Sequence, residues 1–184
     1  TDGITDDLNE GANQLWSRME PYNKEYWMTE TGFGPATDFG IDEGGATYYL
    51  GGKLFNMIAI GNASLVTPWS FHGPEPGEHR LIGMTGVGEY VMDLRYYVFK
   101  HYCRNIRPGM VRIDADPMIQ DDLQVMAFYH TGNGRLTIII NKHTASNVTL
   151  NIALQNLRSI PTLSKGIKCP VACSSSRISI TSKL

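Results

Sequence analysis

The sequence lacks the features by which several classes of protein are recognised. None of its apolar runs approaches the roughly 18 residues that a membrane span requires, and no secretory signal opens the chain. It contains no Gly-x-Ser-x-Gly elbow and no evident Ser/His/Asp order, which argues against an acyl-transfer hydrolase. Its three cysteines offer neither redox spacing nor a second ligand pair for zinc: Cys103, Cys169 and Cys173. We therefore expect no membrane span and no zinc or redox site of these kinds.

Acidic residues are missing from the last third of the chain. Residues 123–184 carry seven Lys and Arg but no Asp or Glu, whereas residues 1–122 carry all 18 acids and nine bases. The net charge of −2 is therefore the sum of −9 on residues 1–122 and +7 on residues 123–184. The basic residues are scattered and accompany no known nucleic-acid module, so we expect no nucleic-acid partner. With 42% hydrophobic and 18% charged residues, the chain should be globular, with one or two domains.

The first 108 residues alternate between helical and strand patterns. Each of two predicted strands is followed by a Gly-rich loop and then by a helix. That order is typical of a parallel (β/α) barrel, whose functional loops lie at one face. The predicted elements are a helix over 7–19, a strand over 25–30, a helix over 43–60 capped at Gly61, a strand over 64–71, a loop over 72–88 and a helix over 89–105.

After residue 109 the period of the apolar residues changes from 3.6 to 2. Four predicted strands with a hairpin turn at Thr131–Gly134 form an antiparallel meander, one sheet of a β-sandwich. The predicted fold class is therefore α/β followed by all-β. The strands lie near 111–114, 123–129, 136–140 and 148–154, and the domains are 1–108 (α/β), 109–157 (β-sandwich) and 158–184, a Ser-rich basic tail that we expect to be poorly ordered.

Two residues at the predicted strand ends form a candidate carbohydrate site. Glu30 ends the first strand, and Trp69 lies near the end of the second. Barrel enzymes keep their chemistry at the C-terminal ends of strands. The Trp face can stack on the C–H face of a sugar while the carboxylate attacks the anomeric carbon. The other interpretation is that Glu30 is a solvated strand-end acid and Trp69 a core residue.

With these elements in place, the chain resembles the C-terminal part of a glycoside hydrolase of clan A, most closely family 30, from about Trp16 to Leu154. The most specific portion is the long helix followed by Arg107-Pro108-Gly109, which is similar to the family's passage from its last barrel helix into its β-sandwich. The resemblance implies the C-terminal portion of a (β/α)8 TIM barrel beside an antiparallel β-sandwich. Glu30, in a Trp-Met-Thr-Glu run, matches the nucleophile on the seventh strand, and Trp69 matches the aromatic residue that shapes the sugar subsite.

The resemblance also implies a partner and a location. The substrate would be a β-glycan or β-glycoside, cleaved with retention by two carboxyl groups, so that no metal and no other cofactor is needed. The family implies a secreted or extracellular protein. The rival hypothesis is a non-catalytic fragment that binds carbohydrate or a partner chain. Sugar binding that survives Glu30→Gln without turnover would favour the rival.

The second carboxyl group is where the chain departs from the family. Family members carry the acid/base in an Asn-Glu pair on the fourth barrel strand, far upstream of the nucleophile. The pair Asn9-Glu10 lies only twenty residues before Glu30 and within a predicted helix, so we interpret Glu10 as a solvated helix residue. The chain also begins at Thr1, without Met. We therefore expect a missing N-terminal barrel part, and expect this chain alone to be inactive.

The loop after the second strand departs from one branch of the family. Members that bind the glucuronate branch of xylan use basic residues just after the eighth strand, whereas this loop has no Arg before Arg80. His72 lies in that position and could hydrogen-bond a sugar hydroxyl, although a lone loop His is often structural or solvated. The sequence thus predicts a retaining β-glycanase fragment with Glu30 as nucleophile and with Trp69 and His72 as sugar contacts.

Overall fold

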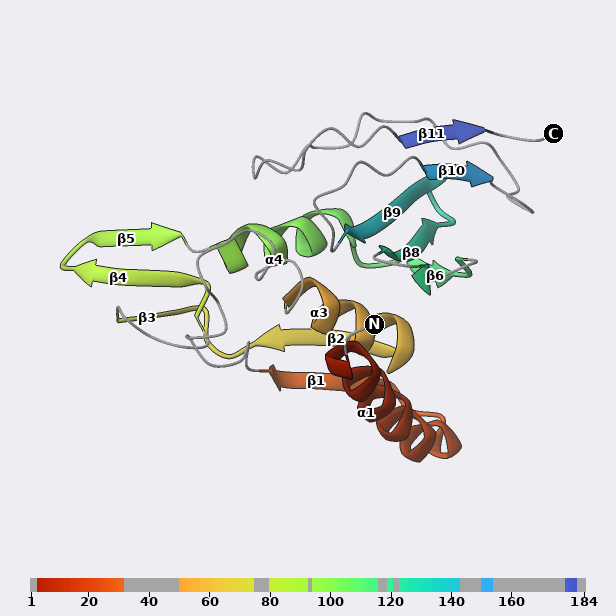
Figure 1. Ribbon diagram of the computed structural model, residues 1–184, viewed down its shortest axis with the longest axis horizontal. Coiled ribbons are helices and arrows are strands. Elements are labelled where there is room, and N and C mark those ends of the chain that lie inside the picture. Colours follow the sequence, from red (N-terminus) through yellow and green to blue (C-terminus); the bar gives the residue numbers. More distant parts are fainter. Residues whose placement is uncertain are drawn as a thin grey trace.

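The computed structural model describes residues 3–31, 50–74, 80–92, 94–115, 119–120, 123–142, 150–153 and 178–181. Within these ranges the chain is a mixed α/β arrangement of several small sheets and a few helices (Figure 1). A parallel strand pair with its helices forms the N-terminal part, and an antiparallel sheet follows the helix α4. No helix in these ranges is long and apolar enough to cross a membrane.

The N-terminal part contains the two strands that the sequence predicts. Helix α1 (Gly3–Met19) ends in a 3-10 turn (Glu20–Tyr22), and β1 (Tyr26–Thr31) follows. β1 pairs in parallel with β2 (Ala63–Pro68). Both strands and their parallel direction are confirmed, although β2 ends three residues earlier than predicted.

The helix between these strands departs from α-helical geometry. The first seven residues of the predicted span 43–60 lie outside the described ranges. Beyond them, α3 (Gly52–Phe55) continues into a π-helical segment, η3 (Asn56–Ile60). The Gly61 N–H donates to the Asn56 carbonyl oxygen at 2.7 Å, which is the five-residue spacing of a π-turn. The predicted C-terminal cap at Gly61 is confirmed, although Gly61 has φ −78° and the left-handed conformation falls on Asn62.

A small sheet replaces much of the predicted loop over 72–88. β3 (His72–Pro74) pairs in parallel with β4 (Ile82–Gly86), which pairs antiparallel with β5 (Glu89–Met92). Figure 1 shows this three-stranded sheet beyond the arrowhead of β2. Loop-like composition misled the prediction, since glycine within a strand often marks a close backbone approach rather than a loop.

The long C-terminal helix of the α/β part is shorter than its sequence pattern. Helix α4 runs over Leu94–Asn105, so the predicted start at residue 89 is wrong. Residues such as Tyr90 and Val91 fit a strand as well as a helix. Gly88 has a φ of 80°, which a residue with a side chain adopts only with strain, and the chain reverses there into pairing with β4. Strand pairing therefore decides the structure of these residues.

The predicted strands after residue 109 form an antiparallel sheet with a different order. β6 (Val111–Ile113) and β7 (Ile119–Gln120) both pair with β8 (Leu123–His130), and β9 (Arg135–Lys142) pairs along the length of β8. The hairpin turn before β9 is confirmed, with the Gly134 N–H donating to the His130 carbonyl oxygen at 2.8 Å. The central strand is thus β8.

The last predicted strand of the meander lies in another sheet. β10 (Leu150–Ala153) pairs in parallel with β11 (Ile178–Thr181), so its predicted place beside β9 is wrong. The alternation of apolar residues is the same in both strands, and the register sets Leu150 opposite Ile178 and Ile152 opposite Ile180. The rest of the predicted tail over 158–184 lies outside the described residues.

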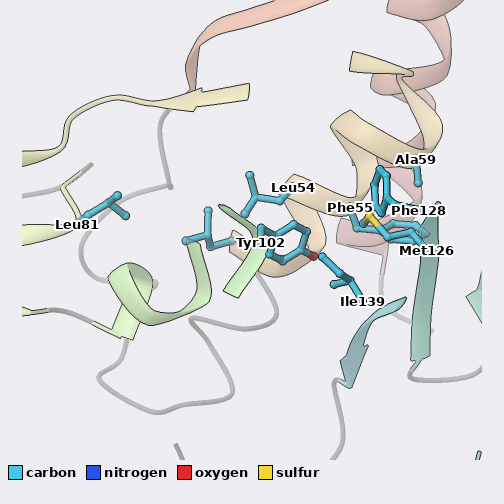
Figure 2. Close-up of a cluster of buried hydrophobic side chains, with 9 residues drawn as sticks. Leu54, Phe55, Ala59, Leu81, Tyr102, Met126, Phe128 and Ile139 are labelled. Carbon is cyan, nitrogen blue, oxygen red and sulfur yellow. The ribbon is translucent and has the colours of Figure 1, made fainter. Parts of the chain in front are cut away.

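The hydrophobic core joins the α3–η3 helix to the antiparallel sheet (Figure 2). Alternate residues of β9 are buried, and their cross-strand partners on β8 are buried with them. That face meets the apolar side of the helix and one residue of α4. The core members are Leu50, Leu54, Phe55, Ala59, Leu81, Tyr102, Met126, Phe128 and Ile139.

A cluster of buried polar groups lies within this core. The Asn141 side-chain amide nitrogen donates to the Gly51 carbonyl oxygen at 2.9 Å, to the Tyr102 hydroxyl at 2.6 Å and to Gln124 Oε1 at 3.2 Å. The Tyr102 hydroxyl donates in turn to the Gly51 carbonyl at 2.9 Å. A Cβ on Gly51 would lie 3.2 Å from Asn141 Oδ1, so a larger residue there would push the Asn141 side chain aside by a few tenths of an ångström. Burial raises the pKa of Tyr102, an effect that the bond from Asn141 partly opposes.

We expect Tyr102→Phe to lower the free energy of unfolding by about 1–2 kcal/mol, because it leaves buried partners without one hydrogen bond. Urea denaturation would measure the loss. Tyr97→Phe is a matched control on the same helix, because the Tyr97 hydroxyl makes an exposed, long contact of 3.8 Å to the Met92 sulphur. It should change stability by less than about 0.5 kcal/mol. Equal effects of the two substitutions would contradict a special role for the buried cluster.

Candidate functional site

The C-terminal ends of β1 and β2 lie side by side. The register places Thr31 opposite Pro68, and the Trp69 N–H donates to the Thr31 carbonyl oxygen at 3.0 Å. Glu30, one residue before Thr31, therefore occupies the same end of the strand pair as Trp69. This is the arrangement that the sequence predicts for a carboxylate and an aromatic residue at one edge of a parallel sheet.

The register of the strand pair is irregular at this edge, with the residue count of a β-bulge. Between the pairs Met28–Val66 and Thr31–Pro68, β1 carries one more residue than β2. The extra residue falls at Thr29 or Glu30, and the Thr67 hydroxyl donates to the Thr29 carbonyl oxygen. Bulges redirect a side chain relative to regular alternation and are frequent beside active sites. Glu30 thus lies within an irregular part of the β1–β2 register rather than in a regularly paired strand end.

Thr67 is the residue that sequence reasoning missed. Periodicity identifies the strand that contains it, but a bulge is a property of two paired strands. No pattern within the run Leu65-Val66-Thr67 predicts that a side-chain hydroxyl satisfies the facing backbone. The only available signal was the presence of a hydroxyl residue one position before Pro68 at the strand end.

Both main candidates are open to solvent. The Glu30 side chain is exposed, and Trp69 is 58% exposed. Trp69 is therefore not a core residue, and its indole face is available for stacking. The chain continues through a cis Trp69–Ser70 peptide bond into β3. The roles of Glu30 as nucleophile and of Trp69 as sugar platform stay predictions.

His72 begins β3, three residues beyond Trp69, and its side chain is exposed. Its carbonyl oxygen accepts a hydrogen bond from the Ser70 hydroxyl at 3.1 Å, which holds the chain between the two residues. The imidazole is open to solvent, and its predicted bond to a sugar hydroxyl stays a prediction. Arg80, the first basic residue of the loop, is only 4% exposed.

The pair Asn9-Glu10 lies inside α1, as the sequence predicts. It is separated from Glu30 by the rest of that helix and the 3-10 turn. Its position in a helix excludes a strand-end acid/base role of the kind that the family uses. Within the described ranges, no group of three or more His, Cys, Asp or Glu side chains is placed to hold a metal ion.

The groups with shifted pKa values report packing rather than a reactive centre. Burial raises the pKa of Tyr26, at the start of β1, and lowers the pKa of Lys53 on α3. On α4, burial lowers the pKa of His101. Burial raises the pKa of the Cys103 thiol, while a backbone hydrogen bond and the positive charge of Arg107 lower it by less. None of these four lies at the C-terminal ends of β1 and β2. The candidate site therefore rests on geometry.

Comparison with known proteins supports the fold. No protein-family model matches the chain, and no curated protein matches it. Solved structures do match, among them an endo-beta1,6-glucanase with a TM-score of 0.50 and 19% sequence identity. The match covers 70% of this chain and 31% of the glucanase chain, so this chain spans about a third of that protein's length. The likeness is one of fold, to a glycoside hydrolase, and membership of family 30 stays a prediction.

We expect Thr67→Val to lower the free energy of unfolding by about 0.5–1.5 kcal/mol, the usual contribution of one hydrogen bond. Valine keeps the shape and the strand preference of threonine but leaves the Thr29 carbonyl without its donor. Thr67→Ser keeps the donor and is the control, with a smaller loss. Thermal unfolding of the two variants would compare them. A serine variant as unstable as the valine variant would show that the hydroxyl contributes nothing.

Proposed function

We propose that this chain is the C-terminal part of a retaining glycoside hydrolase that cleaves β-glycans, with Glu30 as the nucleophile. One observation carries the proposal: an exposed carboxylate lies at the C-terminal end of β1, at the same edge as an exposed Trp that directly follows the neighbouring parallel strand β2. That edge is where parallel barrels build their active sites. The fold likeness to an endo-glucanase supports the same class.

The proposed chemistry is a double displacement. The Glu30 carboxylate attacks the anomeric carbon and forms a glycosyl ester, while a second carboxyl group protonates the departing oxygen. That group then takes a proton from the water that hydrolyses the ester. The two carboxyl groups of a retaining enzyme lie about 5–5.5 Å apart. We assign no residue of this chain to the second role, which the family resemblance gives to an upstream barrel strand.

Trp69 contributes the sugar platform in this proposal. Its exposed indole can cover the C–H face of a pyranose ring, and its backbone bond to Thr31 fixes it beside Glu30. A flat aromatic surface removes apolar sugar surface from water and restricts the orientation of the ring. His72 can add one hydrogen bond to a hydroxyl. These contacts orient the anomeric carbon toward Glu30.

The proposed architecture is the last quarter of a (β/α)8 barrel followed by a β-sandwich. β1 and β2 would be the seventh and eighth barrel strands, and α4 would lead into the sandwich sheet of β6 to β9. A barrel closes only when every strand is paired on both edges. The proposed partner is therefore the remaining part of the barrel, and the chain alone should be inactive. The secreted or extracellular location is proposed from the family resemblance alone.

The first substrates to test follow from the fold likeness. The glucanase with a similar fold is described as acting on β1,6-glucan, so neutral β-glucans are the first substrates to assay. A non-catalytic sugar-binding role is the second candidate, since the exposed Trp69 suits binding with or without hydrolysis. Glycan affinity that persists in Glu30→Gln, with no turnover in the parent protein, would favour that candidate.

Glu30 should be labelled by a mechanism-based fluoroglycoside in a protein that joins this segment to an acid/base carboxylate. Peptide mass spectrometry would locate the label. Glu30→Gln should lower kcat by at least about 10³-fold, because it removes the group that forms the intermediate. Glu25→Gln is the matched control, since Glu25 is exposed and lies just before β1. A label on another carboxylate, with Glu30→Gln active, would refute the assignment.

Activity should not require a glucuronate branch. The segment between Trp69 and Pro74 has no Lys or Arg, and the first arginine after it, Arg80, is buried. A glucuronate carboxylate would find no exposed guanidinium or ammonium among the described residues of this segment. We expect kcat/KM on undecorated β-glycans to equal or exceed that on glucuronoxylan oligosaccharides of matched length. A strict dependence on the branch would contradict the proposal.

A further inference from the structure

The three-stranded sheet beyond β2 has two distinct faces. The register aligns His72 with Ile82 and Met92, and it aligns Met84 with Tyr90. Because residues paired across strands point to the same face, and residues two apart do as well, these five share one face. The opposite face carries Gly73, Gly83 and Val91.

The shared face is covered at one end and open at the other. Ile82 packs against the core, and the Met92 sulphur accepts a hydrogen bond from the Tyr97 hydroxyl of α4. Tyr90 lies nearer the hairpin turn and is 64% exposed. His72 is also exposed, at the opposite corner of the sheet. Strand spacing and rise put the Cα atoms of His72 and Tyr90 about 12 Å apart.

We propose that Tyr90 is a second sugar platform, which binds the part of a neutral glycan that extends beyond the Glu30–Trp69 strand ends. The inference rests on the proposed function and deepens it, because it gives the substrate several bound sugar units. A phenol ring offers a large rigid surface with a polar edge, which suits a sugar's mixed surface. Met84, between His72 and Tyr90 on this face, adds adaptable apolar contact.

The sheet that carries Tyr90 is joined to the segment that carries Trp69, and this favours the same glycan as the ligand of both. The chain passes from Trp69 to His72 within three residues, and the Phe71 carbonyl oxygen accepts hydrogen bonds from the N–H groups of Leu81 and Ile82 at 3.2 and 3.0 Å. The sheet is therefore tied to the segment that carries Trp69. The five side chains of the face include no carboxylate, lysine or arginine. A neutral glycan fits this composition, whereas a charged polymer would find no counter-charge on it.

Tyr90 and Val91 give a matched pair of variants, since they are adjacent on β5, both exposed, and on opposite faces. Binding would be measured by calorimetry on the full chain, which the proposed function expects to turn over no glycan by itself. The probes are β1,6-linked gluco-oligosaccharides of two and six units. Tyr90→Ala should raise the Kd of the six-unit probe about tenfold and leave that of the two-unit probe unchanged. Tyr90→Phe should bind as well as the parent, and so should Val91→Ala.

Four outcomes would overturn the inference. The first is an unchanged six-unit affinity in Tyr90→Ala, with a melting temperature equal to that of the parent. The second is an equal loss in Val91→Ala, which would indicate an effect on the hairpin rather than on one face. The third is a six-unit probe that does not bind at all. This result would overturn the inference even if the labelling experiment at Glu30 supported the proposed function. A Tyr90-dependent change in sedimentation with unchanged glycan affinity would assign the face to a protein contact instead.

Discussion

The carbonyl oxygen of Gly51 is the point on which the arrangement of this chain depends. It accepts hydrogen bonds from side chains on α4 and β9, and Gln124 of β8 joins the same buried cluster. Each of these groups would lose solvation at a cost of about 1–3 kcal/mol if its partner were absent. The cluster therefore permits one relative position of the helix, α4 and the sheet. Apolar packing around it supplies attraction but much less geometric selectivity.

This constraint reaches the candidate site through the helix. α3 begins next to Gly51, and η3 ends at Ile60. Two residues later, the Asn62 side-chain oxygen accepts a hydrogen bond from Arg112 of β6 at 3.1 Å. The helix is thus tied to the antiparallel sheet near both ends. β2 starts immediately after Asn62, so its direction follows from these two ties. The position of Trp69 is in that sense set by residues that no substrate would touch. A site on strand ends gains its rigidity from such support.

The sequence predicts an element correctly where the local pattern of apolar residues is enough to determine its structure. The apolar run before Glu30, the second run before Trp69 and the turn before β9 all have the predicted structure, and the parallel pairing follows from the strand–loop–helix order. The prediction of an element or of its neighbour fails where the pairing between distant strands determines the structure. Residues 89–92 suit either period, and pairing with β4 makes them a strand. Residues 150–153 alternate correctly, but alternation does not name the partner strand. The sequence also does not predict the irregular register between Met28 and Thr31 or the hydrogen bonds of the buried Asn141, because each depends on a group far away in sequence.

The exposure of the candidate site to solvent determines what the proposed chemistry still requires. Glu30 and Trp69 are both exposed at an edge formed by only two paired strands among the described residues. A carboxylate in water is stabilised by solvent, and attack on an anomeric carbon requires that solvent to be replaced by substrate and by fixed protein groups. Under the proposed function, Trp69 and the face of Tyr90 supply one wall for the sugar. The opposite wall and the proton donor must then come from the other barrel strands, so barrel closure would complete the fold and the active site in one step.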